Sequence, residues 1–365
     1  MLSTETFQPD WISVPGDTIV ELLEEKNISV HKFADQMNSS IDFVYELLNG
    51  TAIITEETSQ RLSEVLGASV DFWLRREFQY REGLVRLKKV AEQSWLKLLP
   101  IRDMVNFGWI KDEVAKSVDA LLVYFGVDTI NEWHYKYQAE MAQVSFRTSS
   151  SFKQQPAAVA AWLRQGELQS QSIECQDWDA QLFEQALTEI RALTKIKDPE
   201  VFLPRLKAIC AKCGVAIAIV RTPNGCQASG VTKFLTQNRA LLMLSFRYLT
   251  DDHFWFTFFH EAGHLLLHGK NAVFVEEIGK NRLVSEEEKE ANDFAAEQLI
   301  PGIYREAMLK LSVSNKKAVI GFATEIGISA GILIGQMQQA GKIEYNRFNS
   351  YKRKYTWEGI PDFNR

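Results

Sequence analysis

The sequence is poor in the features that mark exported, disulfide-stabilised or membrane-spanning proteins. Only four of its 365 residues are cysteine, which is too few for a disulfide scaffold of this size. No apolar run reaches the roughly 18 to 20 residues needed to cross a bilayer. The first residues, MLSTETFQPDW, have neither the basic start nor the apolar core of a signal peptide. We therefore expect a cytoplasmic protein with no membrane partner.

Two of the cysteines, Cys210 and Cys213, form a CxxC pair, but no second pair follows to complete a metal site. They lie in LPRLKAICAKCGV, a pattern typical of a helix ended by Gly214. We interpret both as small helix residues.

The length favours two or three domains. Residues 16–80 predict a bundle of short helices, with stops at Gly50 and Gly67. Five side chains there can cap the start of a helix: Asp17, Ser29, Ser40, Thr55 and Ser69. We divide the chain into an N-terminal bundle over 1–84, a helical connector region over 85–200 and a C-terminal domain over 201–365.

The pattern changes after Cys213. Residues 215–220 (VAIAIV) are short and β-branched, and residues 239–248 (RALLMLSFRY) are a second strand candidate. The segment TPNGCQASG between them has the composition of a turn. Helical patterns resume at Asp252 and run to about residue 340. The predicted fold class is therefore mostly α with a small β-sheet, α+β.

Inside the predicted helix 251–269 lies an HExxH motif, from His260 to His264. A spacing of four residues turns a helix by about 400°, so both imidazoles project from nearly the same side and can bind one Zn²⁺. Glu261 points about 100° away from His260, so it can flank the metal and take a proton from a bound water. The motif predicts a zinc centre with Glu261 as the general base.

His268 extends this row but lies about 12 Å along the axis from His260. One metal with bonds of about 2.1 Å does not easily take both ends of such a row. We interpret His268 as a residue that supports a ligand from behind or lines the substrate pocket, with a plain helix-capping role as the alternative.

The third ligand is expected to be a carboxylate from the helix SEEEKEANDFAAEQLIP, residues 285–301. A capping box from Ser285 to Glu288 and the helix dipole explain the first acidic residues. Glu290 differs, because it lies within about 40° of Phe294 at the edge of the apolar stripe, where a carboxylate needs a cationic partner. Two further residues could orient a ligating histidine: Asn292 and Asp293.

HEAGHLLLHG followed by EANDFAAEQLIP resembles the ImmA/IrrE family of zinc peptidase domains. The resemblance spans about residues 85–350 and is sharpest over 229–301. It implies a zincin-like fold, Zn²⁺ held by His260, His264 and Glu290, and Glu261 as the catalytic base. It also implies cleavage of a partner repressor that controls mobile elements or stress genes.

Residues 16–78 resemble the helix-turn-helix domain of HigA-type antitoxins, within the larger Xre-like group. The residues that carry the resemblance are PGDTIVELLEEKNIS, FADQMNSS and ELLNGTAIITEETSQRLSEVLGASVDFWL. The helix-turn-helix is expected at Val30 to Met37 and Ser40 to Leu48, the second being the recognition helix.

The charge of this region does not suit a DNA reader. Residues 1–84 hold 15 Asp plus Glu against 6 Lys plus Arg, a net charge of −9. The phosphates of duplex DNA attract cationic side chains and repel carboxylates. The recognition helix instead carries Asp42 and the aromatic Phe43 and Tyr45, which suit a protein groove unless they belong to the core. The remaining candidate DNA contacts are His31, Lys32 and Gln36.

Together these patterns predict a regulatory zinc metalloendopeptidase with a helix-turn-helix domain, acting on a repressor-like protein in gene control, a toxin–antitoxin pair or a mobile-element or defence system. The alternative is a non-catalytic antitoxin or repressor that docks a toxin through its zinc domain. A neighbouring toxin gene favours the antitoxin, and a small separate repressor gene favours the protease. We expect a homodimer with a protein partner, DNA binding being disfavoured by the acidic N-terminal region.

Overall fold

The computed structural model describes residues 12–145, 155–268, 274–276 and 286–360. It separates into two compact units, Met1–Trp95 and Leu96–Arg365. Most helices from the range 85–200 belong to the second unit.

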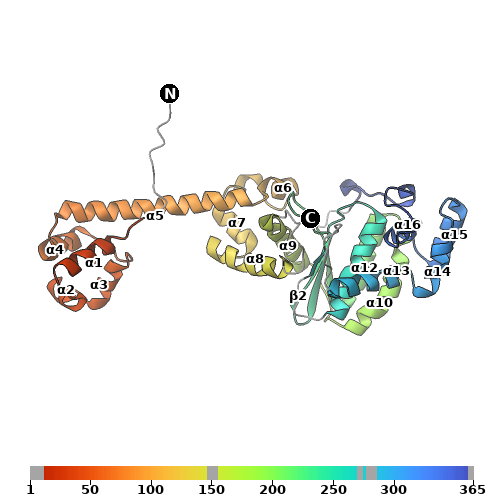
Figure 1. Ribbon diagram of the computed structural model, residues 1–365, viewed down its shortest axis with the longest axis horizontal. Coiled ribbons are helices and arrows are strands. Elements are labelled where there is room, and N and C mark those ends of the chain that lie inside the picture. Colours follow the sequence, from red (N-terminus) through yellow and green to blue (C-terminus); the bar gives the residue numbers. More distant parts are fainter. Residues whose placement is uncertain (1–11, 146–154, 269–273, 277–285, 361–365) are drawn as a thin grey trace, which may run out of the picture. The chain divides into compact units, whose positions relative to one another are not determined.

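The first unit is a helical bundle (Figure 1). Its helices are α1 (Pro15–Glu25), α2 (Val30–Gln36), α3 (Ile41–Leu48), α4 (Glu56–Leu66) and the start of α5 (Val70–Leu98). The predicted helix-turn-helix is confirmed as α2 and α3, which begin at the side-chain caps Ser29 and Ser40. Asp17 was expected to cap the start of its helix. It lies one turn inside α1 and accepts a hydrogen bond from the backbone N–H of Val14, the true cap.

The second unit has a mostly helical chain around a small sheet, so the expected α+β class is confirmed. Its helices are α6 (Ile101–Asn106), α7 (Val118–Phe125), α8 (Ile130–Ser145), α9 (Pro156–Gln171), α10 (Ala180–Leu193), α11 (Pro199–Lys212), α12 (Asp251–Leu267), α13 (Glu286–Leu299), α14 (Gly302–Lys310), α15 (Lys316–Ile326) and α16 (Ala330–Gln339), with three short 3₁₀ turns. Cys210 and Cys213 are buried at the end of α11, as the sequence suggested. Among the described residues no single helix is long and apolar enough to cross a membrane, and the bent pair α15 and α16 passes by length and composition only.

The sheet has four strands in the order β1 (Val215–Ile219), β3 (Arg239–Leu244), β2 (Gly230–Thr236) and β4 (Phe274–Glu276). β1 runs parallel to β3, whereas β2 is antiparallel to both β3 and β4. The sequence predicted β1 and β3, although β3 ends four residues earlier than expected. It did not predict β2 and β4, since β2 has polar side chains at its centre and β4 is only three residues long.

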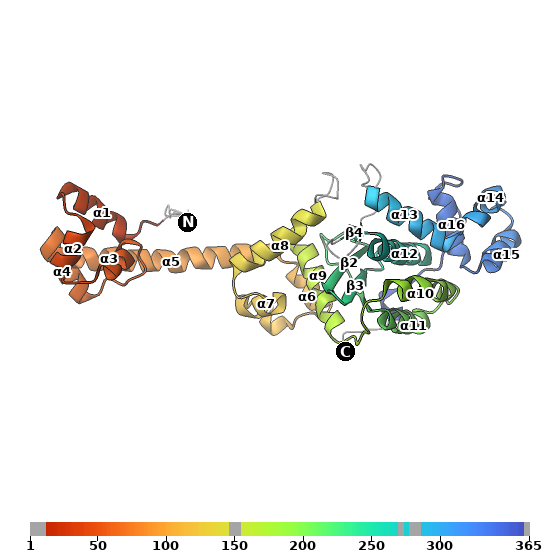
Figure 2. The same cartoon turned by 90° about the horizontal axis from the view of Figure 1, so that it is seen from below.

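Alternate residues of β1 and β3 face two different helical layers. Val215, Ile217 and Ile219 of β1 pack into the larger core with α10 to α13, α15 and α16. Ala216 and Ala218 pack on the other side against α9. Figure 2 shows α9 and α12 on opposite sides of the strands. The two-residue period of a strand therefore yields three layers, with the HExxH helix α12 covering one face.

The polar side chains of β2 have buried partners on these two faces. Thr232 Oγ1 donates a hydrogen bond to Glu261 Oε2 on α12 over 3.0 Å. On the other face Lys233 Nζ lies 2.5 Å from Glu167 Oε1 of α9, and the other oxygen of Glu167 is 3.0 Å from Arg164. These partners make polar residues tolerable in a buried strand.

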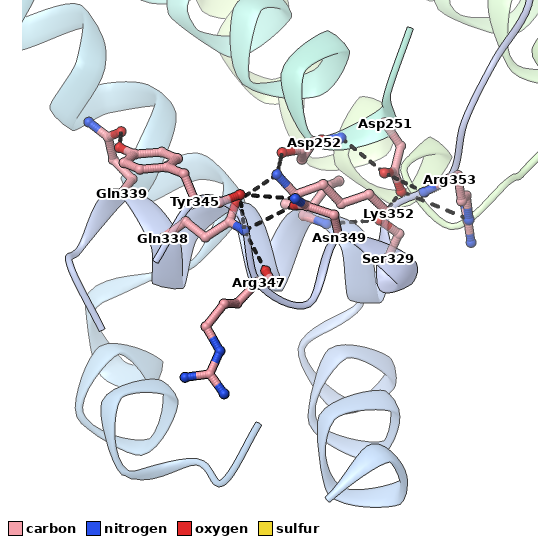
Figure 3. Close-up of polar contacts among 11 residues, drawn as sticks. Asp251, Asp252, Ser329, Gln338, Gln339, Tyr345, Arg347, Asn349, Lys352 and Arg353 are labelled. Atoms are coloured by element: carbon pink, nitrogen blue, oxygen red, sulfur yellow. Dashed lines mark hydrogen bonds and ion pairs between the residues drawn. The ribbon is translucent and has the colours of Figure 1, made fainter. Parts of the chain in front are cut away.

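The N-terminus of α12 is tied to the C-terminal segment of the chain (Figure 3). Asp251 accepts hydrogen bonds from Ser329 Oγ at 2.6 Å and from the backbone N–H of Arg353 at 2.9 Å. The ammonium of Lys352 lies 2.7 Å from the carboxylate of Asp252. These bonds fix the start of the helix that carries the HExxH motif.

We expect the buried carboxyl of Asp251 to make stability depend on pH. Burial is the main cause that raises its pKa to about 6, against about 3.9 in an unfolded chain. The folded state thus holds this proton more tightly, so the stability that the carboxyl contributes is full below pH 4 and is lost as the pH rises to about 6.

Asp251→Asn keeps an acceptor for the backbone amide but does not ionise. Relative to the wild type it should gain stability on the order of 3 kcal/mol between pH 4 and pH 6.5, measured by denaturant unfolding of the second unit at each pH. Parallel pH curves for the two proteins would contradict this assignment.

Candidate metal centre

The two histidines of the motif meet inside the core. His260 and His264 lie one turn apart on α12 and are 0% and 1% exposed. Their Nε2 atoms are 3.0 Å apart. Both rings therefore point the same nitrogen at one place, as the spacing predicted.

A second helix reaches this place because α12 and α13 approach each other closely at Gly263. A Cβ atom at Gly263 would lie 3.0 Å from Cδ1 of Phe294 and 3.3 Å from Cα of Ala291. A larger residue would push the helices apart. The glycine within the HExxH motif thus allows the close approach of α13 to α12.

Glu288 of α13 completes a three-residue cluster. Its carboxylate oxygens lie 3.6 Å from His260 Nε2 and 3.5 Å from His264 Nε2, and the residue is 3% exposed. The three ligand atoms lie within 4.8 Å of one another. Tetrahedral zinc with bonds near 2.1 Å holds its ligands about 3.4 Å apart. Two nitrogens and one carboxylate at this spacing fit an open catalytic-type zinc site.

The structure brings Glu288, and not the expected Glu290, to the two histidines of the motif. Glu290 has a 55% exposed side chain, and its Oε2 lies 2.9 Å from His268 Nε2. The physical reason lies in the helical wheel: Glu288 is within about 20° of Ala295 and Leu299, both fully buried, so it belongs to the buried stripe. Phe294, used to place Glu290, is only half-buried.

Glu288 lies in the first turn of α13, where acidic residues are common because they interact favourably with the helix dipole. Its acidic side chain therefore did not stand out as a candidate ligand. The supposed capping partner, Ser285, lies outside the described residues. The buried stripe of Ala295 and Leu299, extended back by two turns to position 288, was the signal in the sequence that points to Glu288.

The protonation of the site suits a metal. Burial, as the largest cause, lowers the pKa of His264 to about 4. The imidazole is therefore neutral at neutral pH and offers a lone pair, as metal binding requires.

The other ring nitrogen of each histidine also has a partner. His260 Nδ1 lies 3.2 Å from Oδ1 of Asn292, and His264 Nδ1 lies 2.9 Å from Nδ1 of His268. Asn292 and His268 thus contact the two histidines of the motif, where the sequence suggested supporting residues. Asp293 is exposed, about 100° further around α13 than Asn292.

Glu261 is fully buried beside these histidines. The hydroxyl of Thr232 holds one carboxylate oxygen, and the other would lie 2.7 Å from a Cβ atom at Gly230. β2 therefore approaches the carboxylate closely at a glycine and orients it through a threonine. Sequence reasoning missed Thr232, because β2 itself was not predicted; the alternation in GVTKFL was the available signal.

The helix-turn-helix presents most of its expected contact residues to solvent. His31, Lys32 and Gln36 on α2 are exposed, as is Asp42 on α3. Tyr45 is 47% exposed. These five side chains are available for a partner.

Phe43 differs, because it is half-buried and packs against the core of the bundle. The alternative that this aromatic residue serves the core therefore holds in part. Tyr45 is the better probe of docking.

Comparisons with known proteins agree with both units. The model of the IrrE N-terminal-like domain, of peptidase family M78, matches residues 217–334. A helix-turn-helix family model matches residues 19–73. An uncharacterized HTH-type transcriptional regulator of Escherichia coli (strain K12), YddM, is 36% identical over 85 residues, which are 23% of this chain and 88% of that protein. The chain therefore belongs to the helix-turn-helix regulators through its first unit, and its second unit carries an IrrE N-terminal-like domain that holds His260, His264 and Glu288.

Proposed function

We propose that this protein is a zinc-dependent metalloendopeptidase that cleaves a partner regulatory protein in the cytoplasm to control gene expression. The observation that carries the proposal is the convergence of two buried imidazoles and the carboxylate of Glu288, with the buried carboxylate of Glu261 next to His260 on α12. A donor set of two histidines and one carboxylate is typical of catalytic zinc in peptidases.

His260, His264 and Glu288 would hold the metal, which when bound supplies a Lewis acid and lowers the pKa of water. Glu261 would take a proton from the attacking water and pass it to the leaving amine. Thr232 holds one oxygen of Glu261, which leaves the orientation of the carboxylate fixed during both transfers. Asn292 and His268 keep the two imidazoles turned toward the metal.

The acidic first unit supports a protein partner rather than a long contact with DNA. Four of the six basic residues in 1–84 already bind groups of the same unit: Arg61, Arg75, Arg76 and Arg81. The other two are Lys26 and Lys32. Few cations therefore offset the 15 acidic residues at a phosphate surface.

The metal assignment predicts about one zinc per purified chain. Glu288→Ala should weaken zinc binding by more than about 100-fold, because it removes a ligand and not only an outer contact. Affinity is measured by competition with a chromophoric chelator. Glu286→Ala, an exposed carboxylate in the same first turn of α13, should bind zinc like the wild type. Unchanged affinity in Glu288→Ala would place the third ligand elsewhere.

The catalytic assignment predicts that Glu261→Gln binds zinc normally but does not cleave. A pull-down of this variant from the native host, analysed by mass spectrometry, should recover an intact partner that the wild type releases in fragments. Loss of cleavage on the order of 100-fold or more is expected for removal of the general base. Equal amounts of intact partner bound to both proteins would favour the non-catalytic docking function.

The charge of the first unit predicts weak binding to random duplex DNA at physiological salt. The slope of log affinity against log salt should be shallow, since each neutralised phosphate contributes about −0.9. Fluorescence anisotropy of the full chain at several salt concentrations measures both. Tight binding to its own promoter, lost in Gln36→Ala or Lys32→Ala and unchanged in Tyr45→Ala, would contradict the protein-docking assignment.

A further inference from the structure

A row of hydrogen bonds leads from the metal-binding face of His264 to the protein surface. His264 turns Nε2 toward Glu288 and Nδ1 toward His268, whose Nδ1 lies 2.9 Å away. His268 then places its Nε2 2.9 Å from Oε2 of Glu290. Both distances are those of well-formed hydrogen bonds.

Metal binding fixes the direction of every donor in this row. A ligating Nε2 presents its lone pair, so the neutral ring of His264 carries its proton on Nδ1. That N–H must donate to Nδ1 of His268, which leaves the proton of His268 on Nε2. There it donates to the carboxylate of Glu290, which as an anion only accepts.

We propose that His268 and Glu290 act together as a positioning pair for His264, with the carboxylate working through the intervening imidazole. This inference rests on the proposed zinc site and assigns Glu290 a role outside the metal ligands. The pair locks the ring orientation and tautomer of His264. Hydrogen bonds in a row polarise one another, so the carboxylate also makes Nε2 of His264 a stronger donor to the metal.

His260 provides an internal comparison. Its Nδ1 is held by the amide oxygen of Asn292, an uncharged acceptor, over 3.2 Å. The row behind His264 is shorter at each step and ends in a charge. The two ligands are therefore supported unequally, and His264 is the one whose binding strength depends on an anion.

The burial of the pair fits this role. The side chain of His268 is 7% exposed, whereas that of Glu290 is 55% exposed. The exposed carboxylate of Glu290 keeps most of its hydration. Its charge acts on His264 through the buried ring of His268, so no further anion has to be buried beside Glu261 and Glu288.

The first test is zinc affinity in the full chain, measured by chelator competition. His268→Ala should lower the affinity 10- to 100-fold, the range found for outer partners of metal-ligating histidines. His268→Asn can place an acceptor near the same position and should restore part of this loss. Asp293→Asn removes an exposed carboxylate from the same helix and should leave the affinity unchanged.

The second test is a double-mutant cycle. Glu290→Gln should weaken zinc binding several-fold in the wild-type background and have no further effect once His268 is alanine, because its influence passes through that ring. If Glu290 were itself a ligand, its replacement would weaken binding equally in both backgrounds.

A spectroscopic readout separates positioning from a general loss of structure. In the Co²⁺-loaded protein, the Nδ1 protons of His260 and His264 should give two exchangeable, paramagnetically shifted signals. The His264 signal should disappear or exchange rapidly in His268→Ala and return in His268→Asn, while the His260 signal stays.

The outcomes distinguish the two proposals. Wild-type zinc affinity in His268→Ala, or additive effects in the cycle, would overturn the positioning pair and leave the peptidase assignment standing. Absence of zinc binding by the wild type would overturn both. Normal pair behaviour together with no proteolysis would support the pair and reject only the peptidase function.

Discussion

The candidate metal centre depends on the close contact between α12 and α13 at Gly263. This contact brings a carboxylate from one helix to two imidazoles on the other, although the three residues lie 28 positions apart at their extremes. Glu288 is buried at this contact, and Glu261 is buried where α12 meets β2. Two carboxylates enclosed in a largely apolar core are costly unless a cation offsets their charge. Their burial therefore favours a cation at this point.

The sheet contributes to the site through one strand. β2 carries Gly230 and Thr232 toward α12, and the same strand carries Lys233 toward Glu167 on the opposite layer. β2 therefore contacts both Glu261 of α12 and Glu167 of α9. At the other end of α12, Asp251 is bonded to Ser329 and to the backbone of Arg353. The HExxH helix is thus held both along its length and at its start.

The sequence was sufficient where local rules decide the structure. The spacing of His260 and His264 fixed their common face, and Ser29 and Ser40 marked the starts of α2 and α3. The sequence was insufficient where the packing of one helix on another decides which side chain faces inward. Glu288 and Glu290 are both acidic residues near the start of α13, and only the packing of that helix on Gly263 turns one inward and the other outward.

In the first unit, the helix-turn-helix fold does not by itself determine the binding partner. Its sequence matches helix-turn-helix regulators, yet its arginines bind groups of the same unit. Arg61, for example, donates to the carbonyl groups of Met37 and Asn38 in the turn between α2 and α3. Because the guanidinium of Arg61 already donates to these carbonyl groups, it is less available to bind a DNA phosphate. The helix-turn-helix fold of this unit therefore does not by itself decide its partner, because its arginines already have partners within the unit and 15 acidic residues lie in 1–84.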